Sequence, residues 1–307
     1  MKIVLLGSGA ALPTLHRWPT SLAVQRNNEI LLFDCGEGAQ IRFQQAKLKP
    51  GKLSKVFISH FHGDHIYGLI GLLTSFQLAG RTKPLDLFAP AGMTDYLAFM
   101  QKLSHFSFQF DIQIHEFQTD NKEPTWTFDD YSVQAARLQH SLFSLGFRLQ
   151  EKPKPGKFDA IKADELGIPD GPERHQLQNG ESIELANGVV IQPADVIGPA
   201  QPGLKIAICL DTRPCEASIR LAADVDLLIH EATFLSDMHD LAQQTAHSTT
   251  TDAARIAQKA HAKQLLLTHI SARYSKQDEA TILKQAQSIF PNTVLGKDLM
   301  RLNLSSI

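Results

Sequence analysis

The sequence has few cysteines and no long apolar run, and both absences exclude classes of protein. It contains three cysteines, Cys35, Cys209 and Cys215, none of them in a Cys-x-x-Cys spacing. Neither a disulfide framework nor a thiolate zinc site is indicated, and a reducing compartment is expected. The apolar stretch at residues 2–6 is too short for a signal peptide or a membrane span. We therefore expect a cytoplasmic protein with no membrane partner.

A strong net charge is also absent. Lys and Arg number 30 against 32 Asp and Glu, which leaves a formal charge of −2. No global basicity points to a nucleic-acid binder, although a local basic patch matters more than the sum. Hydrophobic residues make up 43% of the 307 positions and charged residues 20%. Such a chain can bury a sizeable core, as one large α/β domain or two smaller ones.

The most informative stretch is the run Ser59-His60-Phe61-His62-Gly63-Asp64-His65. The apolar residues 55–58 before it predict a buried strand, and residues 66–79 after it predict a helix. Three imidazoles and a carboxylate on one strand-to-helix turn can converge without breaking either element. The first two histidines could bind one ion while Asp64 and His65 bind a second. Nitrogen and oxygen donors suit a borderline metal such as zinc, so the run predicts a metal site.

Short strands alternate with helices in both halves of the chain. Strands are predicted at residues 2–6, 22–25, 29–33, 85–88, 112–117, 132–138, 145–149, 182–185, 189–191, 205–209, 226–229, 264–267 and 299–304. Further helices are predicted at residues 39–48, 94–103, 160–166, 250–259 and 278–289. This alternation predicts two βα layers packed as a sandwich, with the helices outside.

Several predicted strands end in a side chain that could bind a metal. These side chains are His60, Asp211, His230 and His269, and His140 follows the strand at 132–138. Ligands at the carboxyl ends of separate strands can meet at one edge of a sandwich. Each also has a simpler explanation: Asp211 could cap a helix opened by residues 212–214, and the histidines could lie in solvated loops. Their recurrence beside the first cluster favours a shared site.

Composition changes between residues 151 and 180, which are rich in proline and glycine. The basic residues of this segment are Lys152, Lys154, Lys157, Lys162 and Arg174. Apart from one short helical window, the segment shows no periodicity. A segment of this length without a core-facing pattern is either disordered or a functional protrusion.

Six motifs resemble, in chain order, the ribonuclease Z family of tRNA 3′-processing endonucleases among the metallo-β-lactamase fold hydrolases. They are Leu5-Leu6-Gly7-Ser8-Gly9, Phe33-Asp34-Cys35-Gly36-Glu37, His60-Phe61-His62-Gly63-Asp64-His65, His230-Glu231-Ala232-Thr233, His247-Ser248-Thr249 and Thr268-His269-Ile270-Ser271-Ala272-Arg273-Tyr274. The third motif alone indicates only the larger group of hydrolases, whereas the fourth and fifth are specific. The resemblance implies a metallo-β-lactamase-like four-layer αββα sandwich over residues 1–307. It also implies an inserted, protruding tRNA-binding exosite arm at residues 151–180.

The resemblance further implies two zinc ions per subunit. The first would be bound by His60, His62 and His140, the second by Asp64, His65 and His269, and Asp211 would bridge the two. Seven such ligands can hold two ions with a hydroxide between them as the nucleophile. The same nitrogen and oxygen donors would accept manganese, iron or cobalt.

Two groups outside the ligand set are implied in proton transfer. His247 would assist the departure of the leaving oxygen. Glu231 would orient His247, as carboxylates orient other catalytic histidines. Asp64 would accept a proton in addition to binding metal. The alternative for His247 is a place beside a helix cap, because Ser248-Thr249 could start the helix at residue 250.

Substrate contacts are implied both in the arm and near the site of cleavage. They are Lys152, Lys154, Lys157, Gly171 and Pro172 in the arm, and Arg17 and Arg273 near the cut. Lysines suit backbone phosphates, whose contacts give affinity but little sequence information. The loop at residues 13–21 departs from the family, because Trp18 stands where Asn is expected. Trp18 could stack on a base, and the departure bears on whether substrates already carrying CCA are rejected.

These features predict a homodimeric zinc endoribonuclease that cleaves precursor tRNA 3′ of the discriminator nucleotide. The products are a tRNA 3′-hydroxyl and a 5′-phosphorylated trailer. The alternative is a metal-dependent phosphodiesterase of the same fold acting on small phosphodiesters or cyclic nucleotides, which would not need the arm. A tRNA-binding or metal-storage protein without turnover predicts missing proton-transfer groups, yet Glu231 and His247 are both present.

Overall fold

The computed structural model describes residues 1–117 and 123–305 and contains two seven-stranded sheets. Across the first sheet the strands are β18 (Arg301–Asn303), β1 (Lys2–Gly7), β3 (Ser21–Arg26), β4 (Glu29–Phe33), β5 (Leu53–Phe57), β6 (Leu85–Pro90) and β7 (Ile112–Phe117). Strands β18, β1, β3 and β4 are antiparallel neighbours, and β4 to β7 are parallel. The connections between the parallel strands contain α1 (Ala39–Gln45), α2 (Gly63–Ile66), α3 (Gly68–Leu78) and α4 (Met93–Ser104).

The second sheet also combines antiparallel and parallel strands. Its order is β17 (Thr293–Leu295), β15 (Leu265–Thr268), β14 (Leu227–Glu231), β13 (Lys205–Cys209), β10 (Leu145–Glu151), β9 (Tyr131–Arg137) and β8 (Thr125–Thr127). Strands β13, β14, β15 and β17 are parallel. Between them run α8 (Glu216–Leu221), α9 (His239–Thr245), α10 (Thr250–Lys259) and α11 (Glu279–Gln287). A parallel pair of two-residue strands, β2 (Gly9–Ala10) and β16 (Ile270–Ser271), links the N-terminal region to the segment after β15.

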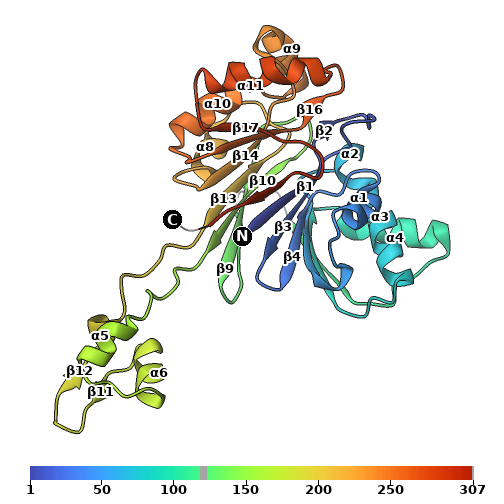
Figure 1. Ribbon diagram of the computed structural model, residues 1–307. Coiled ribbons are helices and arrows are strands. Elements are labelled where there is room, and N and C mark those ends of the chain that lie inside the picture. Colours follow the sequence, from blue (N-terminus) through green and yellow to red (C-terminus); the bar gives the residue numbers. More distant parts are fainter. Residues whose placement is uncertain (118–122, 306–307) are drawn as a thin grey trace. The chain divides into compact units, whose positions relative to one another are not determined.

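Three apolar cores separate four layers. The first core packs α1, α3 and α4 on one sheet through residues such as Phe43, Leu72 and Leu97. The second lies between the two sheets, where inward-facing residues such as Phe33 and Ile229 meet. The third packs α8, α10 and α11 on the other sheet. Figure 1 shows the two helical groups on the outer sides of the two sheets, which confirms the predicted αββα sandwich.

The predicted and observed elements agree best where residues that start or end a helix can be recognised in the sequence. Helix α10 occupies residues 250–259 as predicted, because Thr249 and Asp252 form a capping box at its start. The helix predicted at 66–79 is instead divided at Tyr67 into α2 and α3. The helix expected to open at residues 212–214 begins at Glu216, with Cys215 as its N-cap. The short elements β8, β17 and α9 were not predicted, since each is too short to show a period.

Residues 151–204 form a compact unit of their own. It contains α5 (Ala160–Glu165), α6 (Pro172–Gln178), β11 (Ile183–Glu184), β12 (Val190–Ile191) and α7 (Pro193–Val196). A small core of residues such as Ala163, Leu177 and Ile191 holds these elements together. The predicted hairpin at 182–191 therefore belongs to this unit, which extends beyond residue 180. The segment is folded, and its apolar positions are too sparse to show a period.

No helix in residues 1–117 and 123–305 has the length and apolar character that crossing a membrane requires. The three cysteines are free thiols, with Cys35 and Cys209 buried.

Candidate metal centre

Four of the candidate ligands predicted at strand ends meet at one edge of the sandwich. His60 follows β5, Asp211 follows β13, His269 follows β15 and His140 follows β9. Asp211 and His269 have left-handed backbone conformations, with φ of 43° and 56°. Non-glycine residues adopt such a φ at a cost, which surrounding structure must offset, and such residues concentrate at functional sites. The sharp turn after each strand directs these two side chains into the site.

The first candidate ligand group joins three segments that are far apart in the sequence. It comprises His60, His62, His140 and Asp211. Nδ1 of His62 lies 3.0 Å from Nε2 of His60 and 3.1 Å from Nε2 of His140. Oδ2 of Asp211 lies 3.5 Å from Nε2 of His60 and 3.7 Å from Nε2 of His140. Three imidazole nitrogens and one carboxylate oxygen thus surround one point.

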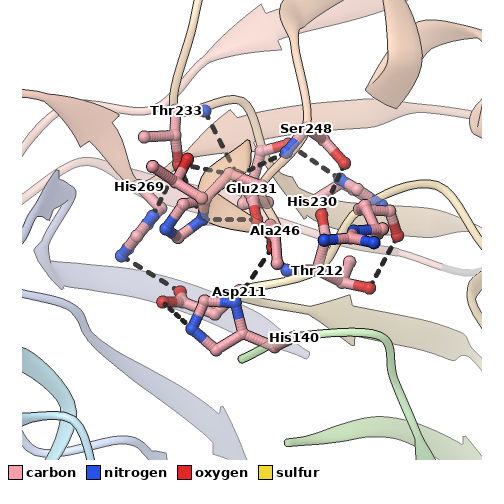
Figure 2. Close-up of polar contacts among 12 residues, drawn as sticks. His140, Asp211, Thr212, His230, Glu231, Thr233, Ala246, Ser248 and His269 are labelled. Atoms are coloured by element: carbon pink, nitrogen blue, oxygen red, sulfur yellow. Dashed lines mark hydrogen bonds and ion pairs between the residues drawn. The ribbon is translucent and has the colours of Figure 1, made fainter. Parts of the chain in front are cut away.

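The second group is built the same way around the other oxygen of Asp211. Oδ1 of Asp211 lies 3.0 Å from Nε2 of His269 and 3.1 Å from Nε2 of His65. Oδ2 of Asp64 lies 3.3 Å and 3.5 Å from the same two nitrogens. Asp211 therefore presents one oxygen to each group, which suits a carboxylate that bridges two ions. Figure 2 shows its carboxylate between His140 and His269.

The charges of this cluster fit a bound cation. Oδ1 of Asp211 is buried and accepts no hydrogen bond among the described residues. Burial alone would lower the pKa of His65, but the Asp211 and Asp34 carboxylates outweigh it and raise that pKa well above its usual value. Burial would raise the pKa of Asp64, yet hydrogen bonds from His269 and His65 hold it well below the usual range. Two carboxylates and several imidazole nitrogens directed at the same points form a donor set that suits a metal ion.

Outer partners fix the orientation of four of the histidines. Nδ1 of His60 lies 2.9 Å from Ser59 Oγ, and Nδ1 of His65 lies 2.6 Å from Asp34 Oδ2. On the other sheet, Nδ1 of His140 lies 2.9 Å from the Ala246 carbonyl, and Nδ1 of His269 lies 2.9 Å from Thr233 Oγ1. In each case the outer bond leaves Nε2 directed at the candidate metal position. Partners of this kind set the tautomer and ring orientation of metal-binding histidines.

A buried carboxylate, Glu231, lies behind the site and holds His247. Its Oε1 accepts the Thr212 amide hydrogen at 2.6 Å, and Oε2 accepts bonds from the Thr233 hydroxyl at 2.6 Å and the Ser248 amide at 3.1 Å. Figure 2 shows these donors around the carboxylate. Nδ1 of His247 lies 2.9 Å from Oε1. Burial would lower the pKa of His247, but the charge of Glu231 outweighs it and raises the pKa to about 9.

The loop after β2 is tied to the site at one end and to the C-terminal segment at the other. The Ala11 amide donates to Oδ2 of Asp64 at 2.7 Å. Asp298 accepts from the Ser8 amide at 3.0 Å and from the Trp18 amide at 2.8 Å. Arg17 is buried, and it donates to Ser8 Oγ and the Gly296 carbonyl, both at 2.7 Å. These bonds hold the loop as one wall of the site.

The predicted substrate contacts near the cut lie in different environments. A cavity of about 650 Å³ opens beside the ligand groups and is lined by Arg273, Asp64 and His247, among others. The Arg273 guanidinium lies 5.0 Å from the centre of the Phe234 ring at the cavity wall. The structure does not bring Arg17 or Trp18 into this lining. The indole packs against Gly38, where a Cβ atom would lie 2.0 Å from Cζ3 of the ring.

The predicted contacts in the 151–204 unit are exposed. Lys152, Lys154 and Lys157 are all exposed on the stretch before α5. Gly171 has φ 130° and caps α6, and Pro172 is the first residue of that helix. Only glycine readily adopts this φ, and proline is favoured at a first helical position. The Gly-Pro pair thus has a structural reason, which is to start α6.

One strand-end histidine does not join the site. His230 is fully buried, with Nδ1 2.7 Å from the Glu231 carbonyl, and it belongs to none of the candidate ligand groups of the described chain. Its place within β14 rather than after it turns the side chain away. The simpler explanation of Asp211, that it caps a helix opened by residues 212–214, is wrong, because α8 begins at Glu216 with Cys215 as its N-cap.

Sequence reasoning missed the outer partners, above all Asp34, Ser59 and Thr233. Asp34 directly follows β4, has φ 56° and accepts bonds from Ser59 as well as His65. Its position at a strand end is the signal that could have identified it. Thr233 gives no such signal, because its role depends on His269, which is distant in sequence.

The chain is similar to proteins of one family over its full length. It is 42% identical to the ribonuclease Z of Acaryochloris marina over 306 residues, covering 98% of this chain and 96% of that protein. Among solved structures it matches the short form of human tRNase Z with a TM-score of 0.73 and 28% identity, covering 99% and 100% of the two chains. The metallo-beta-lactamase fold protein YhfI from Bacillus subtilis matches with a TM-score of 0.68 and 18% identity, covering 98% of each chain, which supports the fold. A family model described as "Anti-Pycsar protein Apyc1" matches residues 1–153.

Proposed function

Because the chain belongs to the ribonuclease Z family, we infer that it is a metal-dependent endoribonuclease that processes the 3′ end of precursor tRNA. The observation that carries this conclusion is identity of about 40% to ribonuclease Z relatives along the whole chain, both units included. The alternative, a phosphodiesterase for small esters or cyclic nucleotides, is not favoured by these full-length relatives. The reaction is hydrolysis of the bond between phosphorus and the 3′-oxygen of the discriminator nucleotide. The tRNA keeps a 3′-hydroxyl and the trailer keeps the 5′-phosphate.

We propose that the two ligand groups hold two zinc ions. His60, His62 and His140 would hold one, Asp64, His65 and His269 the other, and Asp211 would bridge them. The donor set supports this assignment, because each group offers nitrogen and oxygen atoms around one point and Asp211 gives one oxygen to each. Such ions supply a Lewis acid for the phosphate and lower the pKa of bound water.

The leaving 3′-oxygen needs a proton, and we propose that His247 donates it. Nδ1 of His247 bonds Glu231, whereas Nε2 has no hydrogen bond within residues 1–117 and 123–305, and His247 lines the cavity that also contains Asp64 and His269. With its pKa raised to about 9, the imidazole is protonated at neutral pH. Asp64, held by the Ala11 amide, is the proposed acceptor of the proton that the attacking water gives up.

We propose that the 151–204 unit is the exosite arm that binds the body of the tRNA. Its support is a separation of charge: all four lysines lie in residues 152–162, and six acidic residues lie in residues 164–184. The only arginine of the unit, Arg174, is paired with Asp164 and Asp170. Lys152, Lys154 and Lys157 are therefore the proposed phosphate contacts, and Gly171 and Pro172 support the arm through α6. Near the cut, Arg273 is the proposed contact, and Arg17 contributes by holding the loop.

We further propose that the protein acts as a homodimer in the cytoplasm, as the family resemblance suggests. Light scattering of the purified protein tests the dimer, and a mass of one 34.0 kDa chain would contradict it.

The deciding experiment maps the cleavage of one end-labelled precursor tRNA with a 3′ trailer at nucleotide resolution. We expect a single cut after the discriminator, lost on treatment with a chelator and restored by zinc. Folded, metal-replete protein that leaves this RNA intact would overturn the proposed substrate and favour the small-phosphodiester alternative.

A further inference from the structure

An aromatic side chain stands exposed beside the candidate metal ligands. Tyr67 is 68% exposed, and its side chain lines the same cavity as His62, Asp64 and His247. Its hydroxyl makes no hydrogen bond among residues 1–117 and 123–305. Neither the proposed metal binding nor the proposed proton transfer uses this ring.

The ring is held in place by the metal-binding turn itself. Tyr67 is the single residue between α2 and α3, and its amide donates to the Gly63 carbonyl at 2.9 Å. The ring lies directly against Gly63, where a Cβ atom would be 2.2 Å from Cε2 and 2.6 Å from Cζ of Tyr67. Gly63 has no positive φ, so its role here is to make room for the ring. The next residue is anchored as well, since the Gly68 amide donates to the Cys35 carbonyl at 2.9 Å.

The surroundings of the ring suit a nucleobase. Leu12, 65% exposed, and Pro13 line the same cavity on the loop held to Asp64 through Ala11. The cavity thus combines polar groups that would act on a phosphate with an apolar wall that contains a fixed aromatic ring. Single-stranded RNA is bound by stacking of its unpaired bases on such rings, and the nucleotides at a cleaved 3′ end are unpaired.

We propose that Tyr67 is the stacking platform for the base of one nucleotide that flanks the scissile phosphate. This inference rests on the proposed function and adds a specificity-determining contact to it. Stacking would hold the sugar-phosphate backbone in register with His247 and the metal ligands. It would also be tolerant of base identity, because every base has a π face.

The test combines protein variants with altered substrates. Wild type, Tyr67→Leu and Tyr67→Phe are compared on three precursor tRNAs: intact, abasic at the discriminator and abasic at the first trailer nucleotide. Leu still covers Gly63 but has no π face, whereas Phe keeps the ring and removes only the hydroxyl. We expect Tyr67→Leu to lower kcat/KM on intact RNA roughly 5- to 100-fold, and Tyr67→Phe to stay within about twofold of wild type.

The abasic substrates distinguish stacking from a structural role. On the RNA that lacks the stacked base, Tyr67→Leu and wild type should cleave equally, while the defect persists on the other abasic RNA. The same Tyr67→Leu defect on all three RNAs overturns the proposal, as does a loss of bound zinc or of thermal stability in that variant. Unchanged cleavage by Tyr67→Leu overturns the inference alone, whereas failure of wild type to cut any precursor tRNA overturns the proposed function.

Discussion

In the unit formed by residues 1–150 and 205–305, the candidate metal ligands are buried or half-buried and are held by hydrogen bonds, whereas in residues 151–204 the proposed phosphate contacts are exposed. Asp211 and His269 are 2% and 1% exposed, and each lies within 4 Å of several other candidate ligands. Lys152, Lys154 and Lys157 are exposed and lie on an irregular stretch. Chemistry on a phosphate needs groups fixed to within a fraction of an ångström. Attraction to an RNA backbone needs only charge at the right distance, which flexible lysines provide.

This comparison predicts the largest effect for the residue shared by both ligand groups. Replacing Asp211 by Ala should abolish cleavage of precursor tRNA and of a small phosphodiester alike, because both groups lose a ligand. Metal content by mass spectrometry should fall, while tRNA binding measured by filter retention survives. The exposed Asp129→Ala is the matched control and should retain full activity. A fully active, metal-replete Asp211→Ala enzyme would remove the two-ion assignment.

The next largest effect is expected at His247, which is not a proposed ligand. Its replacement by Ala should lower kcat about 10²- to 10⁴-fold, the usual contribution of a general acid, without changing metal content. The protonated imidazole is the active form, so activity of wild type should fall as pH rises through the pKa of about 9. A pH profile of kcat should show this alkaline limb in wild type and not in the variant. Persistence of the limb in His247→Ala would assign it to another group.

Removal of the whole 151–204 unit separates binding from chemistry. Strands β10 and β13 are antiparallel neighbours with Gln150 opposite Lys205, so an Asn-Gly turn can join them directly. We expect kcat/KM on precursor tRNA to fall about 10²-fold, since several charged hydrogen bonds of on the order of 1 kcal/mol each are removed. Hydrolysis of a small phosphodiester should stay unchanged. Equal losses on both substrates would mean that the unit supports the site rather than the tRNA.

A smaller effect on chemistry is expected from the outer partner Asp34. Asp34→Asn keeps the shape of the side chain but weakens the bond to Nδ1 of His65, and should lower metal affinity about 10- to 100-fold. Competition with a chromophoric chelator measures this affinity. Saturating zinc should restore most of the activity. No change in affinity would show that His65 is oriented by packing alone.

The smallest effects are expected from the three exposed lysines of the arm. Substituting Lys152, Lys154 and Lys157 together by Ala should reduce the slope of log affinity against log salt by about one for each phosphate that a lysine no longer neutralises. Values of kcat should not change, and the exposed Lys259→Ala in the other unit should alter neither quantity. A wild-type salt slope in the triple variant would place the RNA elsewhere on the protein.

The sequence predicted the elements and residues whose signals are local. Helix α10 was predicted at both ends because its capping residues adjoin it, and the His60–His65 run stood out through its composition. The helix break at Tyr67 was not predicted, because it depends on the ring lying against Gly63 and on the bond from Gly68 to Cys35. The burial of Arg17 was equally hidden, since its partners Gly296 and Glu279 are at the other end of the chain.

The family and the αββα sandwich could be predicted from the sequence, because motif order and hydrophobic periodicity are properties of residues and their spacing. The proposed set of nitrogen and oxygen donors was named from the same local patterns. Which strand-end residues meet follows from the folded arrangement of the two sheets and not from the local sequence. This arrangement directed Asp211 and His269 into the site through left-handed turns, left His230 buried in β14, and supplied Asp34, Ala246 and Thr233 as outer partners. These outcomes depend on backbone direction and on contacts between distant segments, which exist only once both sheets are packed together.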